Sequence, residues 1–108
     1  MNKHSIKNIR DNVPEKLKEE FFEEILAGSN FKLERIISEG HASPKDFWYD
    51  QDKNEFVFLF SGSAELLYDD GRKFFLNAGD YLIIPAHQKH RVERTDSKQK
   101  TYWLALHY

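Results

Sequence analysis

Apolar and polar positions alternate along most of this chain. After Gly28, apolar residues recur at every second position in short runs separated by turn-forming residues, which is the period of a β-strand with two different faces. The predicted strands are 31–38, 55–60, 64–70, 72–77, 80–85, 90–95 and 101–108. The Asp70-Gly71 pair between two of these runs is typical of a hairpin turn. Many short strands without intervening helices indicate an all-β sandwich or small barrel.

The segment before Gly28 has a different period. Leu17, Phe21 and Ile25 stand four positions apart, which places them on one apolar stripe of a helix. A proline near the start of this segment and a glycine at its end suit the two ends of a helix. The predicted organisation is a flexible polar arm at 1–12, one amphipathic helix at 13–28 and a single β-domain at 31–108.

The predicted strand 55–60 is apolar on both faces except at its first residue. One face carries Glu55, Val57 and Leu59, and the other carries Phe56, Phe58 and Phe60. A phenylalanine left in water forgoes about 1.5–3 kcal/mol, so the second face needs cover from the N-terminal helix, a second sheet or a second copy of the chain. A homodimer is the expected assembly. Glu55 is a carboxylate on an otherwise apolar face, where an ionised group needs a partner or a metal.

Composition and charge exclude several classes of protein. The chain has 108 residues, which suits one domain, and contains no cysteine, so that disulfides, thiol nucleophiles and thiolate zinc sites are excluded. Its net charge is −2 and no cluster of lysines and arginines stands out, which argues against a nucleic-acid partner. No apolar run has the length of a membrane span. The expectation is therefore a soluble, cytoplasmic protein without membrane or nucleic-acid partners.

Several polar and aromatic residues stand where they could carry chemistry. They are Trp48, Tyr49, Asp50, Gln51, Glu55, His87, His90, Arg91 and His107. Around them the chain resembles the cupin superfamily. Gly79, Pro85 and His90 have the spacing of the second cupin motif, and His87 stands where the family usually has glycine. Glu55 and Gly62 match the end of the first motif. The resemblance covers about residues 31–108 and implies a double-stranded β-helix of the jelly-roll type.

The first motif departs from the family pattern. Metal-binding cupins usually have a His-x-His shortly before the glutamate, but here the corresponding pairs are Trp48 and Asp50, Tyr49 and Gln51, or Asp46 and Trp48. The resemblance therefore carries over only Glu55 and His90 as metal ligands. Asp50 and an inward-facing His107 would complete a mixed nitrogen and oxygen site suited to Mn, Fe, Ni or Zn.

The remaining candidates have roles around this metal site. Glu55, Asp50 and His87 are the expected catalytic groups, and Trp48, Gln51, Arg91 and Trp103 are the expected pocket walls. Structural alternatives stay open: an ion pair of Glu55 with Arg91, Arg94 or Arg35, a polar turn around Asp50, a rim or hinge position for His87, and a hydrogen-bonded core or edge role for His107.

The resemblance implies a range of functions. One is metal-assisted isomerisation or epimerisation of a small sugar-like molecule, as in phosphomannose-isomerase-like cupins. With iron and an open coordination position, the same scaffold serves dioxygenases. A second hypothesis is a binding or sensing domain without turnover, for which a degenerate metal site is typical. A third is a purely structural, dimerising protein, which leaves Glu55 and the histidines without a role. Fold alone does not choose among them.

Overall fold

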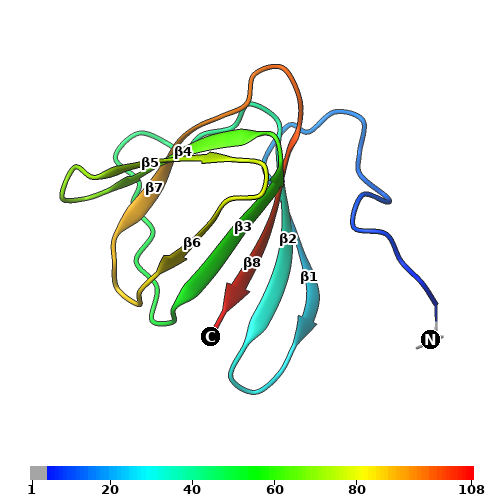
Figure 1. Cartoon of the computed structure of the whole chain (residues 1–108), viewed down its shortest axis with the longest axis horizontal. Helices are drawn as coiled ribbons and strands as arrows, with labels where there is room; N and C mark the ends of the chain where they lie inside the picture. Colours follow the sequence, from blue (N-terminus) through cyan, green and yellow to red (C-terminus); the bar gives the residue numbers. More distant parts are fainter. Residues whose placement is uncertain (1–4) are drawn as a thin grey trace.

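Two antiparallel β-sheets face each other in the part of the chain that the computed structural model describes, residues 5–108 (Figure 1). The strands are β1 Phe21–Ala27, β2 Lys32–Ser38, β3 Glu55–Ser61, β4 Ser63–Tyr68, β5 Lys73–Asn77, β6 Tyr81–Ile84, β7 His90–Thr95 and β8 Thr101–His107. One sheet has the order β1-β2-β8-β3-β6 and the other the order β5-β4-β7. The all-β prediction is confirmed, and each of the seven predicted runs contains an observed strand.

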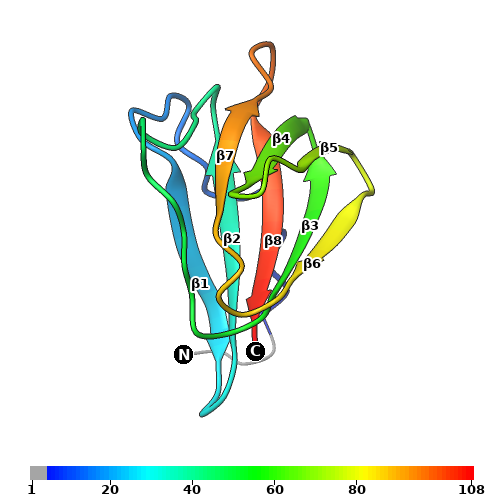
Figure 2. The same cartoon turned by 90° about the vertical axis from the view of Figure 1, so that its left-hand side faces the viewer.

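The core lies between the two sheets (Figure 2). Burial alternates along β3, β4 and β8, as the alternation of the sequence predicts. The buried apolar side chains that meet there include Val57, Leu59, Leu66, Leu76, Ile84 and Trp103. Each contributes about 1.5–3 kcal/mol when fully removed from water, so this layer provides most of the stability of the domain.

The predicted N-terminal helix is wrong, because its second half is strand β1. Glu23 of β1 lies opposite Arg35 of β2, and their side chains form an ion pair of 2.8 Å. Arg35 is only 3% exposed, so its charge needs a partner. Strand pairing places Glu23 opposite Arg35, whereas a helix over 13–28 would not. Pairing with β2 also satisfies backbone groups that would otherwise remain open at a sheet edge. These contacts within the β1–β2 hairpin override the local helical period.

The segment before β1 has no regular secondary structure but is attached to the large sheet. The predicted arm, 1–12, is described from its fifth residue onward, and its first four residues lie outside the described part. Arg35 donates a hydrogen bond of 2.9 Å to the Ile9 carbonyl. The Arg10 guanidinium lies 5.6 Å from the centre of the Phe60 ring, within the range of a cation–π contact.

The outer face of β3 is only partly covered. Phe56 packs its ring against that of Tyr81 at 5.2 Å between centres, while Tyr81 and Ile83 of the edge strand β6 remain 63% and 52% exposed. Within residues 5–108 the second sheet packs on the opposite face, and no helix lies over this one (Figures 1 and 2). No helix of the described residues could cross a membrane either.

Gly62 is the turn by which the chain passes from β3 in the large sheet to β4 in the small one. Its φ of +89° lies in the region that favours glycine, and a methyl group here would lie 2.7 Å from the Thr101 Cα. Gly71, in the β4–β5 hairpin, has a similar φ of +92° but open space around it. A comparison of the two positions therefore distinguishes the cost of backbone strain, which both share, from the cost of a steric clash, which only Gly62 has.

We expect Gly62→Ala to destabilise the protein more than Gly71→Ala. Each variant bears the strain of a left-handed residue, about 1–3 kcal/mol, but only the first also displaces the β8 backbone. Urea unfolding at equilibrium would measure both losses against the unmodified protein. Equal losses would contradict the close approach of Gly62 to Thr101.

Candidate functional site

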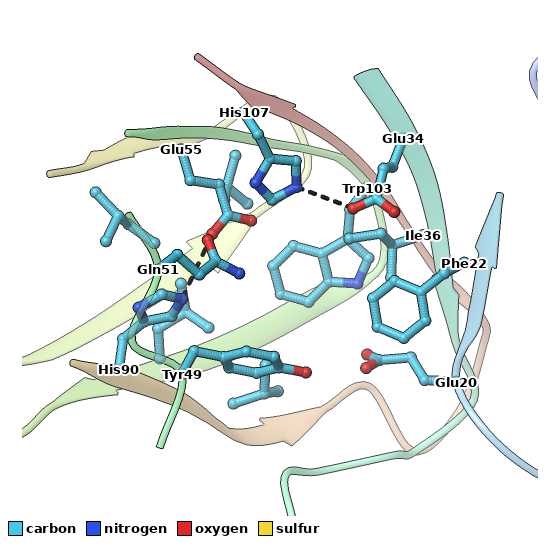
Figure 3. Close-up of a pocket in the computed structure, with 14 residues that line it drawn as sticks. Glu20, Phe22, Glu34, Ile36, Tyr49, Gln51, Glu55, His90, Trp103 and His107 are labelled. Atoms are coloured by element: carbon cyan, nitrogen blue, oxygen red, sulfur yellow. Dashed lines mark hydrogen bonds and ion pairs between the residues drawn. The ribbon is translucent and has the colours of Figure 1, made fainter. Parts of the chain in front are cut away.

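A cavity opens between the two sheets at the end of the core where β3 and β7 begin and β8 ends (Figure 3). It offers about 70 Å³ to the centres of water-sized molecules, which is room for several waters at about 10–15 Å³ each. Its apolar wall consists of Phe22, Ile36, Val57, Leu66, Ile84, Val92 and Trp103. Its polar lining consists of Glu20, Glu34, Tyr49, Gln51, Glu55, His90 and His107. A small polar molecule fits this combination.

Strand ends place most of the polar groups. Glu55 and His90 are the first residues of β3 and β7, and His107 is the last residue of β8. Tyr49 and Gln51 belong to the segment that runs beside the start of β7, where the Tyr49 amide donates to the His90 carbonyl at 2.7 Å and the His90 amide donates back at 3.1 Å. The Tyr49 ring also stacks on the His90 ring, with 5.4 Å between centres.

Two oxygen atoms at this end of the cavity lack a hydrogen-bond partner. Glu55 is 7% exposed, and its Oε1 lies 3.5 Å from His90 Nε2 without an adequate hydrogen bond. Gln51 Oε1 is likewise buried and unpaired among the described residues, and Figure 3 shows its amide between Glu55 and His90. Buried acceptors are normally satisfied, so these two oxygens define a place for a proton donor or a cation.

The protonation of His90 depends on these neighbours. Its Nδ1 donates to the Gln88 carbonyl at 2.9 Å, which leaves Nε2 toward the cavity. Burial is the largest single influence and disfavours the imidazolium, but the Glu55 carboxylate and the Gln88 carbonyl together outweigh it, so that the pKa of His90 lies above its ordinary value.

A second pair of a carboxylate and an imidazole lies beside the first. His107 is opposite Glu55 in the β3–β8 ladder, and its Nε2 lies 2.9 Å from Glu34 Oε1. Glu34 is a site residue that the sequence analysis missed. Its signal was its position two residues before Ile36, on the inward face of β2.

The wall farthest from His90 is made by the segment that was predicted to be helical. Glu20 accepts a hydrogen bond from the Ser38 hydroxyl, and Trp103 Nε1 donates to Ser38 Oγ at 3.1 Å. Phe22 of β1 lies next to Glu20 in this wall (Figure 3). Neither residue is predicted from the sequence, because a helix over 13–28 would not place Phe22 and Glu20 in a cavity between two sheets.

Two of the predicted catalytic residues lie on the rim. His87 and Asp50 have side chains 70% and 43% exposed and form a pair with 3.0 Å between Nδ1 and Oδ1. His87 has a φ of +64°, which agrees with its place at a position where the resembling family has glycine. Asp50 points away from the cavity and does not join Glu55 and His90.

Two of the predicted pocket residues lie outside the cavity. Arg91 stands over the Trp48 ring at 5.9 Å and donates to the Pro44 carbonyl at 3.0 Å, so this pair holds the loop before Tyr49. The other two, Gln51 and Trp103, do line the cavity.

The three arginines considered as partners of Glu55 are engaged elsewhere. Arg35 pairs with Glu23, Arg91 with Glu93 and Arg94 with Glu65. Glu55 is thus left with His90 as its charged neighbour.

The predicted set of four metal ligands is not assembled. Asp50 is on the rim, His107 faces Glu34, and no three His, Asp or Glu side chains in residues 5–108 lie close enough together to share a metal ion. A smaller set fits a metal better: the unpaired oxygens of Glu55 and Gln51, with His90 Nε2 beside them. Two oxygens and one imidazole nitrogen are a suitable donor set for a divalent transition metal, with the Gln51 amide as the unexpected member.

The fold and this site define a cupin. The family model of the cupin domain matches residues 34–107, so the chain belongs to the cupin family. Among solved structures, the chain is similar to a protein from Ralstonia eutropha JMP134 that is provisionally named a mannose-6-phosphate isomerase. The two are 40% identical, over 95% of this chain and 96% of that chain, with a TM-score of 0.90.

More distant structures share the fold. A cupin superfamily protein from Desulfitobacterium hafniense is 14% identical over 88% of this chain and 82% of its own, with a TM-score of 0.72. The polyketide cyclase RemF from Streptomyces resistomycificus is 20% identical over 83% of this chain and 65% of its own, with a TM-score of 0.69. No curated protein matches the sequence.

The lining of the cavity favours one register of the first motif. Of the three pairs that could stand for its His-x-His, Tyr49 and Gln51 are the one whose two members line the cavity.

Glu20 should make stability depend on pH in a characteristic direction. Burial is the main cause that raises its pKa above the ordinary value of 4.5, and the hydrogen bond from Ser38 offsets this only in part. A raised pKa in the folded state means stability that is complete below the unfolded pKa and is lost as pH rises through the folded pKa. We therefore expect Glu20→Gln to gain stability relative to the unmodified protein as pH rises above the ordinary pKa of 4.5, measured by urea unfolding.

Glu39→Gln is the matched control with the opposite sign. The Leu17 amide donates to Glu39 at 2.7 Å and, as the main cause, holds the pKa of this exposed carboxyl below its ordinary value. This variant should lose stability relative to the unmodified protein as pH rises over the acidic range. A stability difference for Glu20→Gln that does not change with pH would show that the Glu20 carboxyl has an ordinary pKa.

Proposed function

We propose that this cupin binds a divalent transition metal (Mn, Fe, Ni or Zn) and isomerises or epimerises a small sugar-like molecule. The observation that carries the proposal is the pair of buried, unpaired oxygens of Glu55 and Gln51 beside His90 Nε2. These three groups would hold the metal. When bound, it would polarise a carbonyl or hydroxyl oxygen of the substrate.

The comparison with known structures supports the type of reaction. The Ralstonia eutropha protein, at 40% identity over nearly the whole of both chains, carries the name of a sugar-phosphate isomerase. An aldose–ketose isomerisation moves one carbon-bound proton to the neighbouring carbon and one hydroxyl proton between the two oxygens, so it requires a base inside a water-poor cavity.

His107 and Glu34 are the groups that could move the carbon-bound proton. His107 Nε2 donates to Glu34 at 2.9 Å, which leaves Nδ1 as a proton acceptor held in a fixed orientation. This pair replaces Asp50 and His87 as the acid–base candidate, since the latter two side chains are largely exposed on the rim. His107 is only 9% exposed, so its side chain is largely removed from bulk water.

A binding or sensing domain without turnover is the second candidate. It is favoured by the presence of Tyr49 and Gln51 at the motif positions where metal-binding cupins have histidines. A glutamine amide binds a metal more weakly than an imidazole does, so a site reduced to one histidine could serve recognition alone. No feature of this cavity specifically favours the dioxygenase alternative.

The metal part of the proposal can be tested by elemental analysis. Protein purified without a histidine tag or chelator should contain close to one metal ion per chain, and His90→Ala should abolish it, because Nε2 is the sole imidazole nitrogen of the donor set. The control is His87→Ala, which removes an exposed rim histidine and should retain the metal. A metal-free protein, even after soaking with Mn, Fe, Ni and Zn, would contradict the proposal.

The catalytic part has a separate readout. In D₂O, proton NMR would follow loss of the hydrogen next to the carbonyl of hexoses and pentoses. His107→Gln should slow exchange by about 10²–10⁴-fold, the usual contribution of a general base, while leaving the metal content intact. Stoichiometric metal without any exchange in the unmodified protein would favour the binding domain instead.

We also propose that the outer face of β3 and β6 packs against a second copy of the chain. Phe56, Phe58, Tyr81 and Ile83 form an apolar surface there that no described element covers. Light scattering should give twice the chain mass of 12.9 kDa. Ile83→Lys should yield a monomer, whereas Phe75→Lys, which alters a 62% exposed residue on β5, should remain a dimer. A monomeric unmodified protein at micromolar concentration would refute the interface.

A further inference from the structure

The cavity has an unusual charge composition for an enzyme of sugar phosphates. Three carboxylates line it, those of Glu20, Glu34 and Glu55, and none of its lining residues is a lysine or an arginine. Proteins bind phosphate groups through arginine or lysine side chains or through helix N-termini. Residues 5–108 contain no helix, so both of these devices are missing from the cavity.

The basic residues closest to the cavity wall are turned away from it or already paired. Arg35 is on β2 but faces the outer side of the sheet, where it binds Glu23 at 2.8 Å. Lys32 lies near Glu34, with 3.5 Å between Nζ and Oε2, and its side chain is 46% exposed. It does not line the cavity, and its charge is partly neutralised by Glu34. None of them offers a free cation to a phosphate inside.

The polar groups are also arranged along one direction. Figure 3 shows Gln51, Glu55 and His90 at one end of the cavity and Glu34, Phe22 and Glu20 at the other. This follows from the sheet order, since β3 is separated from β1 and β2 by β8. A sugar whose carbonyl end lies at Glu55, beside His107, would extend its last carbons past Glu34 toward Glu20. A phosphate there would meet carboxyl groups and no basic side chain.

Hydroxyl groups suit that end better. Glu34 and Glu20 are acceptors, and the neighbouring Ile36 and Trp103 offer apolar surfaces to the C–H faces of a sugar. The buried, unpaired Oε1 atoms of Glu55 and Gln51 add two further acceptors. We infer that this cavity takes an uncharged, unphosphorylated polyhydroxy carbonyl compound and discriminates against its phosphate ester. The inference rests on the proposed function for the orientation of the substrate.

The test is an equilibrium titration of the metal-loaded protein, followed by NMR chemical shifts at low salt. Mannose and fructose are the uncharged probes, and mannose 6-phosphate and fructose 6-phosphate are the charged ones. Each free sugar should bind at least about tenfold more tightly than its ester. Glu34→Lys should reduce or reverse this preference, because it removes an acceptor and supplies a cation. Glu65→Gln, a change of one charge on the other sheet, should leave the preference unchanged.

Several outcomes would overturn the inference. These are equal or tighter binding of the esters, absence of binding by any of the four probes, and a preference that Glu34→Lys does not alter. Binding is measured here without turnover, so its result is separate from that of the proposed reaction. If the protein prefers free sugars but shows no exchange of the carbon-bound hydrogen in D₂O, the catalytic proposal is refuted and the inference on substrate charge stands.

Discussion

The approach of Glu55 to His90 is the constraint on which the site depends. The two residues begin strands of different sheets, so their 3.5 Å separation joins the sheets at the open end of the core. A carboxylate that is 7% exposed is costly unless a positive group lies near it. The same proximity favours the imidazolium form of His90 and contributes to its raised pKa. The Glu55 oxygen nearest His90, Oε1, still lacks a hydrogen bond among the described residues, so it remains open to a further donor or a cation.

Backbone geometry holds this pair in position. Gly62 turns the chain from one sheet to the other within van der Waals contact of β8, and His87 takes a left-handed conformation just before β7 begins. The reciprocal hydrogen bonds between Tyr49 and His90 then place Gln51 beside the pair. The spacing of the cupin motifs has a structural reason: the motif residues of this chain stand at strand ends, as Glu55 and His90 do, or in turns, as Gly62 and Gly79 do.

Local patterns explain why the sequence predicts some parts of this protein well. The strands from β2 to β8 alternate with period two and have clear turns, and Glu55 and His90 follow from motif spacing. The helix predicted for 13–28 is wrong, because Phe21 and Ile25 satisfy a helical stripe as well as a strand. What decides is the pairing with β2, where Arg35 lies opposite Glu23, and a periodic pattern within 13–28 does not contain that information. Asp50 failed as an inward-facing ligand for a related reason: consecutive residues of an irregular segment can point either way, and only the bridge to His90 makes Gln51 the inward one.

These failures fall on the part of the site that lies outside the motif residues. Glu55 and His90 follow from the spacing of the cupin motifs, so the end of the cavity that they form does not by itself specify a substrate. The opposite wall consists of Glu20, Phe22 and Glu34, which lie outside both motifs. The pairing of β1 with β2 places Phe22 and Glu34, and Glu20 directly precedes β1. Because a buried arginine on the outer face of the sheet takes part in that pairing, the stability of the edge strand and the charge of the cavity wall are linked. A change in the N-terminal segment can therefore alter what the cavity accepts without touching the residues that define the family.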